Sequence, residues 1–172
     1  MKKVLFLLLM TLSTICVWGQ GTKFESAKEK TGVLYDETVT NVSSTSALCN
    51  AGTSPIDFDF KLVTLTNIST SAKTSALAIT VTCMISNNIL VSRHTYFIDK
   101  DEFANIISSL KFLKSKTNTS ASITARNKVI KFAKGSSADK IDFIVNDADY
   151  YHFDADELIA IFIAASQGKP IK

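Results

Sequence analysis

This chain has few of the residues and motifs that usually carry catalysis or hold a transition metal. It has two histidines, three cysteines and one tryptophan in 172 residues. It contains no Cys-x-x-Cys pair, no HExxH sequence, no GxGxxG fingerprint and no P-loop. Neither histidine has a serine or cysteine in a recognisable nucleophile setting, although His152 could pair with Asp149 or Asp154. The sequence therefore argues against an enzyme and predicts no cofactor.

An excess of charge of one sign is also missing. Lys2 and Lys3 belong to the N-terminal segment described next, so 17 of the 19 basic residues remain against 16 acidic ones. A nucleic-acid-binding surface needs a clustered basic excess, so we expect no nucleic-acid partner. After residue 20, no apolar run reaches the about 20 residues that cross a bilayer. We therefore expect no membrane span once the N-terminal segment is removed.

Residues 1–20 have the pattern of a secretory signal peptide. Two lysines precede the apolar run Val4–Leu12, and small or aliphatic residues lead to Gly19. We expect cleavage after Gly19 or Gln20, and an exported protein in the periplasm or outside the cell. An uncleaved membrane anchor and a lipoprotein modified at Cys16 are the alternatives, but the apolar run is short for a span.

Two cysteines, Cys49 and Cys83, remain after this cleavage. In an exported chain an even number of cysteines favours a disulfide. A bridge closing a loop of about 35 residues would stabilise the fold by about 4 kcal/mol in the chain-entropy model. The alternative is that Cys83, on the apolar face of a strand pattern, packs as a buried thiol.

The hydrophobic pattern changes its period along the chain. Alternation of apolar and polar residues predicts strands over 56–62, 77–85, 89–98, 121–125, 130–132 and 141–145. Apolar residues at helical spacing predict helices over 100–114 and 155–167. Residues 21–55 show little pattern, and we expect them to form an N-terminal arm with one or two short strands.

Short turns between these strands predict antiparallel pairing. We therefore expect an α+β fold, in which an antiparallel sheet of five to seven strands carries two helices on one face. The expected organisation is a signal peptide over 1–20, an arm over 21–55 and one domain over 56–172. This domain would consist of two tandem strand-strand-strand-helix units, 56–116 and 117–172.

A motif that occurs twice supports this duplication. Residues 96–102 and 151–157 both read Tyr-x-x-Asp-x-Asp-Glu, and each copy precedes a helical pattern. An Asp before a helix accepts hydrogen bonds from N–H groups of the first turn, and a Glu three residues later returns one. The expected helix caps are Asp99, Glu102, Asp154 and Glu157. The alternative is a calcium site, since six carboxylates in two equivalent places are suitable ligands for a hard cation.

The last predicted helix is apolar on more than one side. Residues 158–165 are eight apolar residues in a row, which exceeds what one buried helix face requires. Either another part of the same chain covers the second side, or a partner protein or a second copy does. In the second case, the expected interaction surface is Ile159, Phe162 and Ile163.

The doubled motif, in a small chain whose mature part starts Gly-Thr-Lys-Phe-Glu, resembles a group of small exported bacterial proteins of unknown function. The resemblance covers residues 88–166. It implies a fold of strands with two helices and the envelope of a Gram-negative bacterium, and it implies no catalytic residues.

These observations favour an exported, non-enzymatic domain that binds another protein or associates with itself. One alternative is a periplasmic carrier of small apolar ligands, with a cavity lined by Phe58, Phe60 and Phe143. The other alternative is a calcium-binding or hydrolytic protein that uses the acidic motifs. The sequence does not identify the partner.

Overall fold

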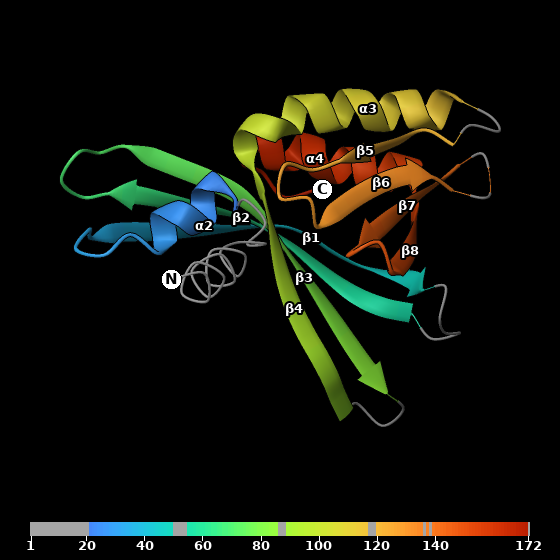
Figure 1. The fold of residues 1–172 in the computed structure, drawn as a ribbon, viewed down its shortest axis with the longest axis horizontal. Helices are drawn as coiled ribbons and strands as arrows, with labels where there is room; N and C mark the ends of the chain where they lie inside the picture. Colours follow the sequence, from blue (N-terminus) through green and yellow to red (C-terminus); the bar gives the residue numbers. More distant parts are fainter. Residues whose placement is uncertain are drawn as a thin grey trace, which may run out of the picture.

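A single curved sheet organises the molecule (Figure 1). The computed structural model describes residues 21–49, 55–85, 89–116, 120–135, 137 and 139–171. Its eight strands are all paired antiparallel, in the order β4-β3-β2-β1-β8-β7-β6-β5. The predicted α+β class and the antiparallel pairing are confirmed. The predicted signal peptide lies outside the described residues.

Each half of the chain is a four-stranded meander followed by a helix. The first half contains β1 (Tyr35–Cys49), β2 (Pro55–Asn67), β3 (Lys73–Ile85), β4 (Ile89–Asp99), the 3₁₀ helix η1 (Lys100–Glu102) and α3 (Phe103–Ser115). The second half contains β5 (Ser122–Thr124), β6 (Ile130–Lys134), β7 (Lys140–Val145), β8 (Asp149–Asp154) and α4 (Ala155–Gln167). Four strands per half replace the three expected, so the expected sheet of five to seven strands was too small.

The segment expected to be an arm supplies a helix and a central strand. It contains α2 (Lys23–Lys28) and all 15 residues of β1. β1 lies in the middle of the sheet and pairs with β2 from Tyr35 to Leu48. The sequence did not predict one long strand here, because β1 buries only Val42 and Ala47 and more than half of its other residues are Ser, Thr, Asp or Glu. β-branched threonine favours a strand, but without apolar alternation the pattern is weak.

The main core lies between the sheet and the pair α3 and α4, which lie together over one end of the sheet (Figure 1). Phe58 and Phe60 of β2 point into this core. The Phe58 ring lies 4.9 Å from that of Phe153 and 5.9 Å from that of Phe143, in edge-to-face contacts. Such pairs contribute about 0.5–1.5 kcal/mol each beyond their area of burial.

The opposite face of the sheet has its own helix. Val63 of β2 and Ala78 of β3 alternate with residues of the main core, so they point to the other side. There they pack with Phe24 of α2, whose ring stacks on that of Phe97 at 5.0 Å. The described chain therefore has three α-helices, two on one face as expected and a third, unexpected one on the other.

The two halves of the sheet share a narrow junction. In the part of the chain that the structure describes, β1 pairs with β8 at two positions, Leu48 with His152 and Cys49 with Tyr151. Farther along β1, the carbonyl of Val42 accepts a hydrogen bond from the N–H of Ile171, in the C-terminal segment. Contact between α3 and α4 links the halves on the core side.

Candidate functional site: the carboxylate cluster at the end of β4

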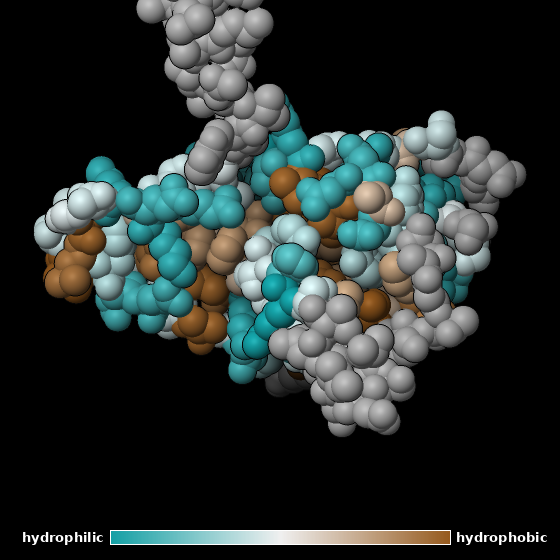
Figure 2. Space-filling model, turned by 60° about the horizontal axis from the view of Figure 1, so that its bottom comes forward, coloured by the Kyte–Doolittle hydropathy of each residue, from teal (hydrophilic) through white to brown (hydrophobic). Residues whose placement is uncertain are grey.

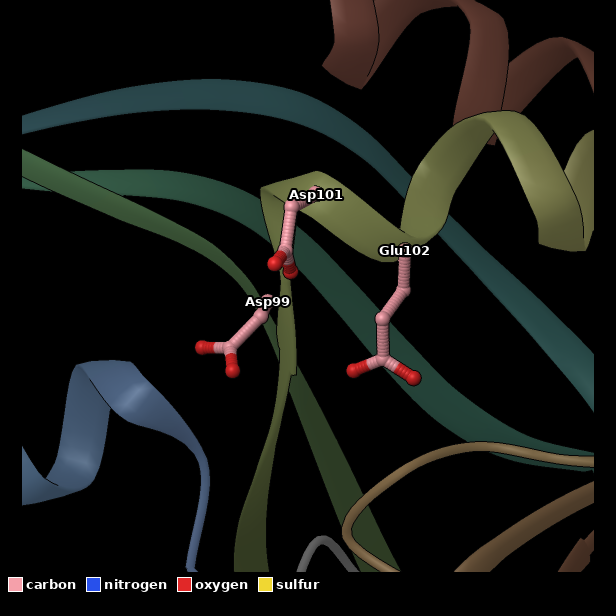
Figure 3. Close-up of side chains that lie close together, drawn as sticks. All are labelled: Asp99, Asp101 and Glu102. Carbon is pink, nitrogen blue, oxygen red and sulfur yellow. The ribbon is translucent and has the colours of Figure 1, made fainter.

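The first copy of the acidic motif gathers three carboxylates where β4 turns into η1 (Figure 3). Asp99 ends β4, and Asp101 and Glu102 belong to η1. One carboxylate oxygen from each lies within 4.8 Å of the others. We call these three residues the acidic cluster. Figure 3 shows them facing the space between α2 and the turn that joins β5 to β6.

Asp99 stabilises a helix that lies far from it in the sequence. It is buried, and its two oxygens accept hydrogen bonds from the backbone N–H groups of Lys23 and Phe24, at 2.8 and 3.1 Å. These N–H groups belong to the first turn of α2. The expected cap on the following helix is not formed, because Asp99 makes no side-chain hydrogen bond to η1, and η1 separates it from α3.

Glu102 holds the turn between β5 and β6. Its Oε2 accepts a hydrogen bond of 2.7 Å from the backbone N–H of Arg126. The other oxygen, Oε1, is buried and has no hydrogen-bond partner among the residues that the structure describes. Glu102 is therefore not a cap for α3, where it occupies the N-cap position without a capping hydrogen bond. An unpaired buried acceptor costs about 1–3 kcal/mol, and more when it is charged.

Asp101 is the exposed member of the cluster and meets two cations. Lys23 Nζ lies 2.6 Å from its Oδ2, and Arg126 Nη1 lies 3.2 Å from the same oxygen. The hydrogen bond from Lys23 is the largest cause that lowers the pKa of Asp101, with Arg126 adding to it and partial burial opposing it. The hydrogen bond between Arg126 and Asp101 raises the pKa of Arg126.

Asn127 ties the same turn to the edge of the sheet. Its Nδ2 donates a hydrogen bond of 2.8 Å to the carbonyl of Phe97 in β4. Its Oδ1 accepts from the N–H groups of Val129 and Ile130 and so shapes the turn itself. The acidic cluster, Arg126 and Asn127 thus hold α2, the end of β4 and the β5–β6 turn together.

In the second copy of the motif, the first Asp acts on the helix that directly follows it. Asp154 accepts from the N–H groups of Asp156 and Glu157, at 2.9 and 3.2 Å, and so caps α4 as predicted. Glu157 takes part only as a backbone donor, and α4, unlike α2, lacks the capping box predicted from its side chain. The Asp156 side chain pairs with Lys114 of α3 at 2.6 Å.

Sequence reasoning missed the residues that surround the first copy. The capping box of α2, formed by Thr22 and Glu25, has a local signal in the sequence Thr-x-x-Glu. Lys23, Arg126 and Asn127 have no such signal, since each acts across 24 to 78 positions of the chain.

The expected interaction surface on the last helix is covered by the chain itself. Ile159 and Phe162 are buried, and Ile163 is half-buried against the main core. α4 contacts α3 on one side and strands of the sheet on the other, which explains its apolar run. The alternative in which the same chain covers the helix therefore holds.

Cys49 and Cys83 are both half-buried, and no disulfide joins them in this structure. β2 separates their strands, and two strand spacings are about 9.5 Å. A disulfide needs Cα atoms about 4.4–6.8 Å apart, so the sheet does not suit the expected bridge. Both thiols lie near Tyr151, whose pKa is raised mainly by burial and further by Asp149 and these thiols.

The other candidate residues, His152 and the phenylalanines expected around a ligand cavity, contact neighbouring strands and core side chains. His152 pairs with Asp142 of the neighbouring strand at 2.7 Å, and not with the expected Asp149 or Asp154. The rings of Phe58, Phe60 and Phe143, expected around a ligand cavity, are fully buried and pack with one another and with further rings.

Comparison of the chain with protein-family models, with curated proteins and with solved structures found no match. Within the described residues, no helix combines the length and the apolar character that crossing a bilayer requires. The cluster therefore has to be interpreted from its own geometry. Its contacts suit a polar clamp between distant elements, and its oxygen atoms are ligands of the kind that hard cations prefer.

Proposed function

We propose that this chain is an exported, non-enzymatic binding domain that pairs an extended segment of a partner polypeptide with the outer edge of β4. The observation that carries this proposal is the position of β4. It is the last strand on its side of the described sheet, and only β3 pairs with it. An unpaired strand edge offers a row of N–H and C=O groups to which another strand can add.

The hydrogen bond from Asn127 to Phe97 indicates which main-chain N–H and C=O groups of β4 point away from β3. The Phe97 carbonyl accepts from a residue outside the β3–β4 ladder, so it faces away from β3. In an antiparallel strand the N–H and C=O of one residue point to the same side, and this side alternates along the chain. The register is regular over this stretch, so Arg93 and Thr95 also direct their main-chain groups outward.

The sheet face that leads to this edge is polar. A cavity of about 520 Å³ lies across β1 to β4, and its lining includes Asp57 and Asp59 of β2, Thr82 of β3 and Arg93 of β4. Arg93 and Thr95 are themselves exposed. We therefore expect a partner segment with polar side chains at alternate positions.

Exposed large apolar side chains are few among the described residues. Leu34 and Ile68 lie together at one end of the sheet, where the Ile68 N–H donates to the Leu34 carbonyl, and Phe112 lies on α3. Polar residues interrupt the apolar ones on the face shown in Figure 2. One such pair and isolated residues are smaller than the apolar patches of a few hundred Å² that mark docking sites. A carrier of apolar ligands also has less support, because the aromatic rings expected around its cavity fill the core.

A proline at Thr95 tests the proposal. Thr95→Pro removes one outward N–H and leaves the bonds to β3 in place, since proline is tolerated where a strand N–H faces solvent. Thr95→Val is the matched control, because both changes remove the hydroxyl contact of 3.0 Å with Thr80 while valine keeps the N–H. Folding of both variants is checked by thermal melting.

The readout is binding to proteins of an envelope extract and self-association by light scattering. The wild-type protein and Thr95→Val are expected to retain the same partner or the same oligomer, and Thr95→Pro to lose it. Retention of every partner by a folded Thr95→Pro protein would overturn the proposal.

A further inference from the structure

We propose that the acidic cluster of Asp99, Asp101 and Glu102 is a binding site for a hard divalent cation of the calcium type. This site lies at the C-terminal end of β4, beyond the stretch from Arg93 to Thr95, and the proposal does not depend on the binding function. It goes beyond the clamp described above, because the clamp uses only contacts within the chain.

The spacing of the carboxylates suits one shared ion. Calcium lies about 2.3–2.6 Å from its oxygen ligands, so two ligands on opposite sides of it are about 4.6–5.2 Å apart. The three ligand atoms of the cluster lie within 4.8 Å of one another. Figure 3 shows the three side chains coming from β4 and η1 into one space, so one ion could reach all of them.

Glu102 supplies an independent observation that points to a ligand. Its side chain starts in η1 and is buried, with only 8% of the residue exposed. Oε2 accepts from Arg126, while Oε1 has no hydrogen-bond partner in the described part of the chain. A buried carboxylate oxygen needs either a donor or a cation. A cation shared with Asp99 and Asp101 would satisfy it.

A bound ion could displace the side chains of Lys23 and Arg126, which pair with the acidic cluster. Lys23 and Arg126 bring two positive charges to three carboxylates. Their side chains are 67% and 46% exposed, so they can turn into water without loss of packing in the core. Exposed ion pairs of this kind are weak. Arg126 Nη1 lies 3.2 Å from Asp101 and 3.8 Å from Asp99, so the incoming ion has to displace this guanidinium.

The second copy of the motif provides the internal control. Asp154 is used by the first turn of α4, and Asp156 pairs with Lys114. Within the described residues, the only group of carboxylates with this convergence is the first copy. The same residue types in the same order are therefore expected not to bind an ion at the second copy.

Calorimetry and thermal melting of the purified protein with CaCl₂ test the proposal. The titration runs to about 10 mM, because calcium sites in extracellular modules have dissociation constants of about 10⁻⁴–10⁻³ M. NaCl at matched ionic strength controls for screening of the ion pairs. We expect binding heat and a rise in melting temperature with CaCl₂ only. Absence of both would overturn the proposal.

Amide NMR locates the ion. The N–H groups of Lys23, Phe24 and Arg126 donate to the cluster, so their signals should move during the titration. The signals of Asp156 and Glu157, which donate to Asp154, should stay in place. Movement of the second set alone would place the ion elsewhere and overturn the proposal.

Two matched variants complete the experiment. Glu102→Gln keeps an acceptor for the Arg126 N–H but removes the charge, and it is expected to abolish the binding heat. Glu157→Gln makes the same change at the same position of the second copy, and it should leave binding unaltered. Equal binding by wild type and Glu102→Gln, or equal loss in both variants, would contradict the assignment.

Discussion

The two copies of the Tyr-x-x-Asp-x-Asp-Glu motif share a sequence and differ in what their side chains contact. In the second copy Asp154 caps the helix that directly follows it. In the first copy Asp99 binds the start of α2, 75 positions earlier, and Glu102 holds the turn at Arg126. The difference follows from η1, which separates Asp99 from α3, whereas α4 begins directly after Asp154. One motif therefore makes a local cap or a long-range clamp, depending on the backbone that follows it.

Loss of Asp99 is expected to have the largest effect on stability. Asp99→Ala leaves the buried N–H of Phe24 and the partly buried N–H of Lys23 without an acceptor, and it removes one partner of Arg126. We expect the free energy of unfolding to fall by about 2–4 kcal/mol, since unpaired buried donors cost about 1–3 kcal/mol and hydrogen bonds to charged groups exceed neutral ones. Urea denaturation measures this change. A loss no larger than that of Asp154→Ala would show that the two copies are equivalent.

Loss of Asp154 should be milder. Asp154→Ala removes the side-chain acceptor of two N–H groups in the first turn of α4. Because such a cap contributes about 1 kcal/mol, we expect urea denaturation to show a fall in the free energy of unfolding of that size. Asp154→Ser, which keeps a capping oxygen, should recover most of the loss, and failure of this rescue would argue against a capping role.

Loss of the Asp101 charge should lower the free energy of unfolding by a small amount that depends on pH. The pKa of Asp101 is lowered by Lys23 and Arg126, so it lies below the ordinary value of 3.8. A lowered carboxyl pKa adds stability above that value, and this stability is lost as the pH falls through the pKa in the folded protein. Because Asp101 is half-exposed, we expect less than about 1 kcal/mol between wild type and Asp101→Asn at pH 7.

Thermal melts of both proteins between pH 7 and pH 2 check this expectation. Their melting temperatures should converge as the medium becomes acidic below the ordinary carboxyl pKa. A gap that widens towards acid would have the wrong sign for a lowered pKa.

The smallest effect is expected at the ion pair of the second copy. The Lys114 and Asp156 side chains are 41% and 74% exposed. Pairs of this kind contribute about 0–1 kcal/mol, so Asp156→Asn should change stability by less than about 0.5 kcal/mol in a urea titration. A loss comparable to that of Asp99→Ala would mean that the second copy also joins distant elements of the fold.

Prediction from the sequence succeeded where the signal is periodic. The strands around Phe58, Ile79 and Phe143 alternate, and the helices around Leu110 and Phe162 follow a period of 3.6, so both were predicted in the right places. β1 was missed as a long central strand because it buries few apolar side chains. α2 was not predicted because its six residues carry one buried side chain, Phe24.

At the candidate site too, the contacts between near neighbours were predictable and the long-range contacts were not. The cap at Asp154 was predictable because its two partners, Asp156 and Glu157, lie two and three residues further along the chain. The partners of Asp99 and Glu102 lie in α2 and in the β5–β6 turn, and no local pattern links them. The apolar run around Ile161 left two alternatives open, which the packing of α4 between α3 and the sheet resolved.

By itself, the sequence determined most of the strands, two helices, the antiparallel pairing and the cap of α4. These features depend on side-chain periodicity and on hydrogen bonds between near neighbours, which the order of residues already contains. Only the tertiary structure decided that β1 is central, that α2 covers the second face, and that the first acidic motif forms a carboxylate cluster. Those outcomes depend on contacts between residues far apart in the chain, and the curvature of the sheet brings these residues together.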